Sequence, residues 1–154
     1  QVARHWDCEV FVFTRGQHHR ELARSLGEAW TGGAEEDPGT LMNSSIIFAP
    51  AGWIVPEALR RLERGGTLAL GGIHMSPIPE LDYQLLWHER TLQSVANSTR
   101  QDVVDFLTVA AEVPVKSNTE LFELGQANEV LLRMKQSEIN GAAVLGVQPR
   151  QGKQ

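Results

Sequence analysis

The chain has 154 residues, of which 42% are hydrophobic and 21% charged, and its formal net charge at pH 7 is −5. This length allows one domain with a buried core, and the composition is that of an ordinary globular protein. The acidic balance argues against nucleic acid or an anionic membrane as a partner. No apolar run reaches the roughly 20 residues that a membrane span needs. With the single cysteine Cys8 and no signal-peptide pattern, we predict a cytoplasmic location.

Apolar runs and helical patterns alternate along the chain. From the N-terminus we predict the end of a helix at 1–6, a strand at 9–13, a helix at 19–26, a weak strand at 28–31 and turns at 32–43. A strand at 45–49, a helix that Pro56 begins and Gly65-Gly66 end, and a strand at 67–70 follow. The remaining pattern predicts helices at 81–88, 100–111 and 124–135, and strands at 91–96, 115–124 and 142–147. Thr99 and Asp102 form a predicted capping box before the helix at 100–111.

The repeating unit is a continuous apolar strand that ends on small residues and is followed by a helix. Parallel sheets covered on both faces produce this pattern. We therefore predict an α/β fold with a doubly wound, Rossmann-like parallel sheet that is incomplete at its N-terminus. The carboxyl ends of the strands are expected to line one crevice, where such sheets bind ligands.

Three segments carry a family resemblance: GGTLALGGIHMSPIP, ERTLQSVANSTRQD and INGAAVL. Through them, residues 1–147 resemble the cofactor-binding half of zinc-type alcohol dehydrogenases in the medium-chain dehydrogenase/reductase superfamily. The resemblance implies a nicotinamide-dinucleotide-binding domain at 1–113, which lacks its first strand and Gly-rich turn. It also implies a segment at 114–147 that packs on an absent catalytic domain, and a tail at 148–154. The catalytic zinc would belong to that absent domain, so we expect no metal ligand and no catalytic residue in this chain.

A basic cluster follows the first predicted strand, at Arg15, His18, His19 and Arg20. In NAD-binding Rossmann domains an acidic residue at the end of the second strand binds the ribose hydroxyls. Here that position falls on Thr14, followed by Arg15, and a hydroxyl beside a guanidinium favours a 2′-phosphate. We predict NADP as the cofactor, bound through Thr14 and Arg15. NAD or dual use remains an alternative, as does a cluster that is merely solvated.

Three further strand ends match cofactor-binding positions of the family. The expected cofactor-binding residues are Phe48, Ala49, Pro50 and Ala51; Gly71, Gly72 and Ile73; and Ala96, Asn97 and Ser98. A strand that simply ends at proline, a tight glycine turn, or an asparagine cap of the following helix would explain the same residues without a ligand. Asn140 and Ala142 occupy positions near which many relatives carry an arginine that binds the pyrophosphate, which weakens the match.

The resemblance implies an oxidoreductase that transfers hydride between NADP(H) and an alcohol or aldehyde with the help of zinc. A zinc-independent quinone or enone reductase of the same superfamily, or a non-catalytic nucleotide-binding module, remains an alternative. This chain alone is expected to be inactive. The Pro-interrupted segment Met75–Ile78 suits an edge strand, which predicts a homodimer, or a tetramer of such dimers, joined there. Coverage of this edge by Leu85-Leu86-Trp87 of the same chain is the alternative.

Overall fold

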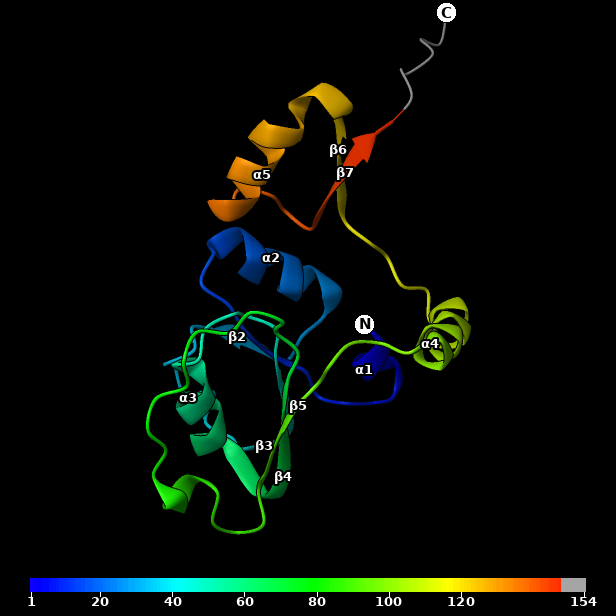
Figure 1. Cartoon of the computed structure of the whole chain (residues 1–154). Coiled ribbons are helices and arrows are strands. Elements are labelled where there is room, and N and C mark those ends of the chain that lie inside the picture. The colour runs from blue at the N-terminus through cyan, green and yellow to red at the C-terminus, as the bar shows by residue number, and fades with distance from the viewer. Residues whose placement is uncertain (148–154) are drawn as a thin grey trace, which may run out of the picture.

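The computed structural model describes residues 1–147 (Figure 1). The predicted tail at 148–154 lies outside the described residues. The helices are α1 (Val2–His5), α2 (Gln17–Leu26), α3 (Ile54–Arg60), α4 (Arg100–Glu112) and α5 (Ala127–Lys135), with 3₁₀ turns η1 (Tyr83–Leu85) and η2 (Leu124–Gln126). The strands are β1 (Phe11–Phe13), β2 (Trp30–Gly32), β3 (Met42–Ile47), β4 (Leu62–Leu70), β5 (Thr91–Ser94), β6 (Thr119–Glu123) and β7 (Ala142–Gly146).

All strand pairs in the described residues are parallel, which confirms the predicted α/β fold class. The strands nevertheless fall into three sheets, β1-β2, β3-β4-β5 and β6-β7, rather than one. A doubly wound order would place one further strand between β1 and β3. The residues that the structure describes supply no strand there, so β1 and β3 each keep one unpaired edge.

The main core lies where α3 covers the β3-β4-β5 sheet. Leu59 and Val55 of α3 are fully buried, as are Leu62 and Leu68 of β4. Ile47 and Leu70 complete the cluster. β4 is buried at alternate positions from Gly66 to Leu70 and pairs on both sides, which makes it the central strand of this sheet. This core fixes the carboxyl ends of three strands side by side.

The predicted boundary between α3 and β4 was wrong. The helix ends at Arg60 rather than at Gly65-Gly66, and both glycines lie inside β4. Gly65 has φ of +71°, and the pairing with β3 shifts between Met42 and Ser44. The glycines therefore accommodate an irregularity within the strand, where the left-handed backbone favours glycine, instead of ending a helix.

The helix predicted at 81–88 is also wrong, because only the single turn η1 forms. Asp82 accepts a hydrogen bond from the Gln84 backbone N–H and begins that turn. His88 and Glu89 then adopt positive φ values of 76° and 62°, which an α-helix does not allow. Leu81, Leu85 and Leu86 instead pack on the core beside α3. Packing outweighs helical periodicity here.

The capping box predicted for α4 is confirmed. The Thr99 hydroxyl accepts from the Asp102 backbone N–H at 3.2 Å, and an Asp102 carboxylate oxygen accepts from the Thr99 backbone N–H at 2.6 Å. The Thr99 backbone N–H and the Thr99 hydroxyl both donate to the Asp102 carboxylate, and these two hydrogen bonds lower the pKa of Asp102. α4 buries no residue, and its Phe106 and Leu107 are more than half exposed.

The β6-β7 pair and α5 form a separate small unit at one end of the molecule, above α2 in the view of Figure 1. Glu120 of β6 binds the Asn140 backbone N–H at 2.7 Å and pairs with Arg133 of α5 at 3.5 Å. The Gln1 side chain holds the connecting segment through two hydrogen bonds to the backbone of Lys116.

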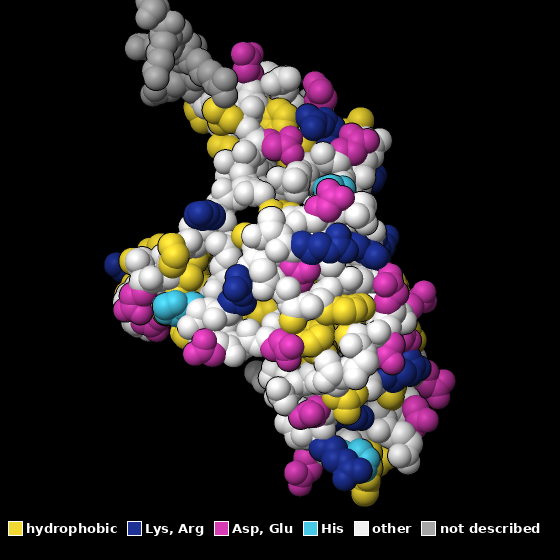
Figure 2. Space-filling view, turned by 180° about the vertical axis from the view of Figure 1, so that it is seen from behind, with side chains coloured by type: hydrophobic (Ala, Val, Ile, Leu, Met, Phe, Trp, Pro, Cys, Tyr) yellow, Lys and Arg dark blue, Asp and Glu magenta, His cyan; other side chains and the backbone are white. Residues whose placement is uncertain are grey.

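The face shown in Figure 2 carries basic and acidic side chains interspersed, with hydrophobic groups exposed in several places. Large apolar side chains that lie open to solvent include Ile46, Phe48, Leu131 and Val147. Among the described residues, no helix has the length and apolar character to cross a membrane.

Candidate functional site

The structure brings three of the predicted loops to one edge of the β3-β4-β5 sheet. Ile47 pairs with Leu70, and Leu70 with Ser94, so the three strands end at the same level. Two further hydrogen bonds extend the ladder beyond the strands: Gly71 N–H to Ile47 O at 2.8 Å and Val95 N–H to Leu70 O at 3.0 Å. The segments Phe48–Ala51, Gly71–Ile73 and Ala96–Ser98 therefore emerge next to one another.

Two large apolar side chains at this edge are exposed to solvent. Phe48 is 76% exposed and Ile73 is 85% exposed, although both are large and apolar. A Cβ atom on Gly72 would meet its nearest neighbour, Ala49 O, at an ordinary 3.6 Å, and Gly72 has no positive φ. Neither packing nor turn geometry within the described residues therefore requires glycine at position 72. Close approach of a ligand to the backbone would require it.

Asn97 is not the cap of α4, because Thr99 holds that position. The Asn97 side chain instead accepts a hydrogen bond from the Ser98 backbone N–H at 2.8 Å. Asn97 has φ of 128°, a backbone conformation that residues other than glycine seldom adopt. The loop after β5 thus has a locally strained conformation at the same edge as Gly71 and Gly72.

Thr14 and Arg15 directly follow β1. The Thr14 N–H donates to Gly32 O at 2.7 Å and so ties the end of β1 to the end of β2. The Arg15 side chain is exposed and makes no hydrogen bond or ion pair with any residue in the described part of the chain. This pair belongs to the β1-β2 sheet, which shares no ladder with β3. The Arg61 guanidinium, 5.9 Å from the centre of the Phe13 ring, is one contact between the two parts.

Arg20 and Glu36 form a link between the loops after β1 and β2. Arg20 Nε donates to Thr14 O at 3.1 Å, and its Nη2 donates to Glu36 Oε1 at 3.0 Å. Glu36 Oε1 also accepts from the Gly33 N–H at 2.9 Å, and the Gly33 and Arg20 hydrogen bonds lower the pKa of Glu36. Sequence reasoning placed Arg20 in the basic cluster but missed Glu36, which lies 16 residues away and gives no local signal.

His18 and His19 are in contact, with ring centres 3.9 Å apart. Both rings fold back over Gly16, the residue that precedes α2. Partial burial, and then the charge of His18, lower the pKa of His19 below 6.5. Both residues lie in the first turn of α2, where the preceding glycine leaves room for the two rings.

The segment after Gly72 does not form the predicted edge strand. Ser76 Oγ accepts from the Gly52 N–H at 2.9 Å, and the Ser76 N–H donates to Pro50 O at 3.3 Å. The backbone of Ser76 and Pro77 lies so close to Gly52 that a Cβ there would overlap with it. The prolines and these contacts hold the segment as an irregular loop over the turn after β3, and Met75 packs on the core.

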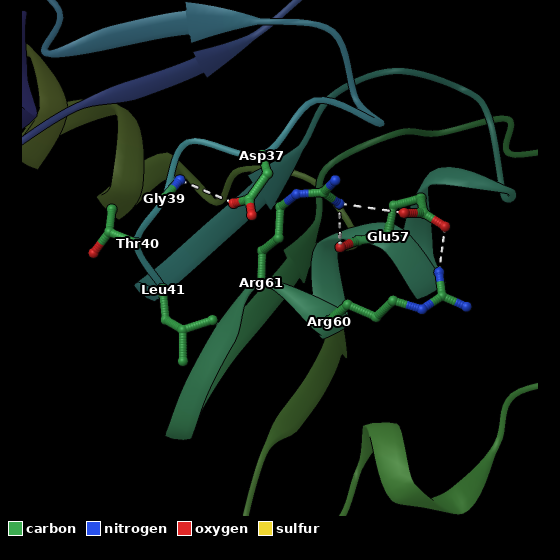
Figure 3. A pocket seen from close by; sticks show the side chains of 7 residues that line it. All are labelled: Asp37, Gly39, Thr40, Leu41, Glu57, Arg60 and Arg61. Carbon is green, nitrogen blue, oxygen red and sulfur yellow. Dashed lines mark hydrogen bonds and ion pairs between the residues drawn. The ribbon is translucent and has the colours of Figure 1, made fainter.

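A hollow of about 420 Å³ lies away from this edge, between the start of β3 and the last turn of α3 (Figure 3). Glu57 pairs there with both Arg60 and Arg61, and Asp37 accepts from the Gly39 N–H. The two arginines thus share one carboxylate. None of the predicted cofactor-binding residues lines this hollow.

The resemblance implies zinc in an absent catalytic domain. Within residues 1–147, no three histidine, cysteine or acidic side chains come together in a way that could hold a metal ion. Zinc ligands converge in sets of three or four. The described residues therefore do not fit that metal.

No family model matches the chain. It is 42% identical over 146 residues to the probable alcohol dehydrogenase AdhA of Mycobacterium tuberculosis, which covers 94% of this chain and 42% of that protein. It is also 27% identical over 153 residues to an alcohol dehydrogenase of Geobacillus stearothermophilus, covering 94% of this chain and 45% of that protein. The chain thus spans less than half the length of these curated relatives.

Solved structures show the same fold. Acetophenone reductase from Geotrichum candidum, solved in complex with NAD, has a TM-score of 0.80 at 17% identity, over 94% of this chain and 43% of that one. The CAD protein of Helicobacter pylori, complexed with NADP(H), has a TM-score of 0.76 at 17% identity, over 89% of this chain and 40% of that one. The resemblance inferred from the sequence is confirmed: the chain is similar to alcohol dehydrogenases, over less than half of their length.

Proposed function

We propose that this chain holds the nicotinamide cofactor of an alcohol dehydrogenase and that it prefers NADP(H) to NAD(H). The observation that carries the proposal is the level edge of β3, β4 and β5, from which the three candidate loops emerge together. Gly72 supports it, since neither packing nor turn geometry among the described residues requires a glycine there and a glycine allows close approach of a ligand. The relatives of the chain, which are alcohol dehydrogenases, favour this reading over a quinone reductase or a non-catalytic module.

Each loop would have a separate task. Thr14 and Arg15 would bind the 2′-phosphate through a hydroxyl and an unpaired guanidinium. Phe48–Ala51 would contact the adenosine and the nicotinamide ribose, where Ala51 leaves room for a sugar. The backbone at Gly71–Ile73 and the loop Ala96–Ser98 would orient the nicotinamide ring from its two sides.

The bound cofactor would supply the hydride chemistry, passing hydride to an aldehyde or accepting it from an alcohol. This chain's contribution is to bind and orient the ring. Its described residues do not fit zinc, so a zinc ion would be held by residues other than these. We accordingly propose that residues 1–113 bind the cofactor and that residues 114–147 pack on a catalytic domain outside this chain.

We also propose that the intact protein assembles as a homodimer, or a tetramer of dimers, near Met75–Ile78. Ile78 is 39% exposed in a loop that its own chain holds in place through Ser76. A loop fixed in this way presents a constant surface to a second copy.

Nuclear magnetic resonance titration of the 154-residue chain tests the cofactor proposal. NADP⁺ should shift the backbone amide signals of Thr14–Gly16, Phe48–Ala51, Gly71–Ile73 and Ala96–Ser98, Pro50 having no amide. NAD⁺ should shift the last three groups with little effect on the first. Shifts confined to Asp37–Leu41 and Glu57–Arg61, around the hollow of Figure 3, would contradict the proposal.

A further inference from the structure

We propose that Glu36 is a specificity-determining residue, because it withholds the Arg20 guanidinium from the 2′-phosphate of NADP. This inference rests on the proposed function, in which Thr14 and Arg15 bind that phosphate. The sequence pattern near the first strand does not point to Glu36. The residue is identified by its ion pair with Arg20 in the structure.

Arg20 lies beside the proposed phosphate-binding turn. Its Nε–H donates to Thr14 O at 3.1 Å, so the guanidinium lies directly against the backbone of the proposed phosphate-binding turn. The side chain is 23% exposed, which leaves it accessible to a ligand. A guanidinium has five N–H donors, and the described residues engage only those on Nε and Nη2. Arg20 therefore has the positive charge, the position and the unengaged N–H donors that binding a phosphate requires.

Glu36 forms an ion pair with Arg20. Its carboxylate lies 3.0 Å from Arg20 Nη2 and is 54% exposed. Hydrogen bonds from the Gly33 N–H and from Arg20 lower the pKa of Glu36, so it is ionised at neutral pH. A carboxylate at this distance neutralises Arg20 and repels a dianionic phosphate. Arg15 also belongs to this turn, and no described residue neutralises its charge.

The hydrogen bonds of Glu36 allow its charge to be removed without loss of the turn that it stabilises. Glu36 Oε1 also accepts from the Gly33 N–H at 2.9 Å, and a glutamine can keep this hydrogen bond. Glu36→Gln therefore removes the charge while it retains the turn. Glu35 offers a matched control: it is exposed, adjacent, and makes no hydrogen bond or ion pair with the described residues.

The experiment measures the affinity of the 154-residue chain for adenosine 2′,5′-bisphosphate and for adenosine 5′-monophosphate, by amide shifts at Thr14–Gly16. A freed charge-assisted contact should make Glu36→Gln bind the bisphosphate about tenfold more tightly, and Glu35→Gln should gain much less. Affinity for the monophosphate should change equally little in both variants. Adding Arg20→Gln to Glu36→Gln should abolish the gain, and raising the ionic strength should reduce it.

The outcomes separate the two proposals. If both nucleotides bind but Glu36→Gln and Glu35→Gln behave alike, the inference about Glu36 is wrong and the cofactor proposal stands. If the gain persists without Arg20, the effect is one of net charge and the inference is again wrong. If neither nucleotide shifts these amides in any variant, the proposed function fails and the inference fails with it.

Discussion

Replacement of Arg15 by alanine is the sharpest test of cofactor preference. Arg15 is exposed and makes no hydrogen bond or ion pair in the described structure, whereas Arg20 is held by Glu36 and by Thr14 O. Arg15→Ala therefore removes no hydrogen bond or ion pair, and the free energy of unfolding should change by less than about 0.5 kcal/mol. Loss of one charge-assisted phosphate contact should weaken NADP binding by about 1.5–3 kcal/mol, or roughly ten- to a hundredfold. NAD binding should hardly change.

Arg24→Ala is the matched control, because Arg24, in the last turn of α2, is also exposed and makes no hydrogen bond or ion pair with the described residues. The assay is the ratio of NADP to NAD affinity in the 154-residue chain, or the ratio of kcat/KM in the intact enzyme. If Arg15→Ala weakens both cofactors equally, Arg15 has a general role and does not read the 2′-phosphate. A matching loss in Arg24→Ala would point to net charge alone.

Three other outcomes follow from the fold, the cap and the proposed assembly. Leu59→Ala, at a fully buried position, should cost about 2–5 kcal/mol in urea unfolding followed by circular dichroism, whereas Leu107→Ala, at 61% exposure, should cost little. Hydrogen bonds from Thr99 lower the pKa of Asp102, so its contribution to stability is present above the unfolded value of 3.8 and is lost as the pH falls through the lower folded value. The stability difference from Asp102→Asn should shrink over that acidic range, and a constant difference would be evidence against the cap. Ile78→Asp should dissociate the intact protein in sedimentation velocity, and a wild-type monomer at micromolar concentration would exclude the proposed assembly.

Local patterns predicted the parts of the fold that depend on local energies. The strand predicted at 45–49 overlaps β3 (Met42–Ile47), because a run of apolar β-branched residues favours a buried strand. Thr99 and Asp102 predicted the start of α4, because a capping box satisfies N–H groups within one turn. Small residues at strand ends likewise located the loops after β3, β4 and β5.

Interactions between distant residues account for what was missed. Gly65 and Gly66 are a typical helix terminator in sequence, and only the pairing with β3 reveals that they lie within β4. The periodicity of 81–88 fits a helix, but Leu85 and Leu86 pack on the α3 core from an irregular segment. The Arg20–Glu36 pair joins two loops whose proximity depends on the parallel pairing of β1 with β2. Local sequence preferences do not determine which strands pair, so they could not predict this ion pair.

The contact between Gly52 and the Ser76-Pro77 backbone makes two loops mechanically dependent on each other. A Cβ at position 52 has no space, and the Gly52 N–H donates to Ser76 Oγ, so a shift of the turn after β3 would disturb the segment at 74–79. In the proposed function, the first of these loops contacts cofactor and the second contacts another subunit. Cofactor affinity and subunit affinity would then be thermodynamically linked, and each would change the other by the same factor. Gly52→Ala is the substitution that would disturb both at once.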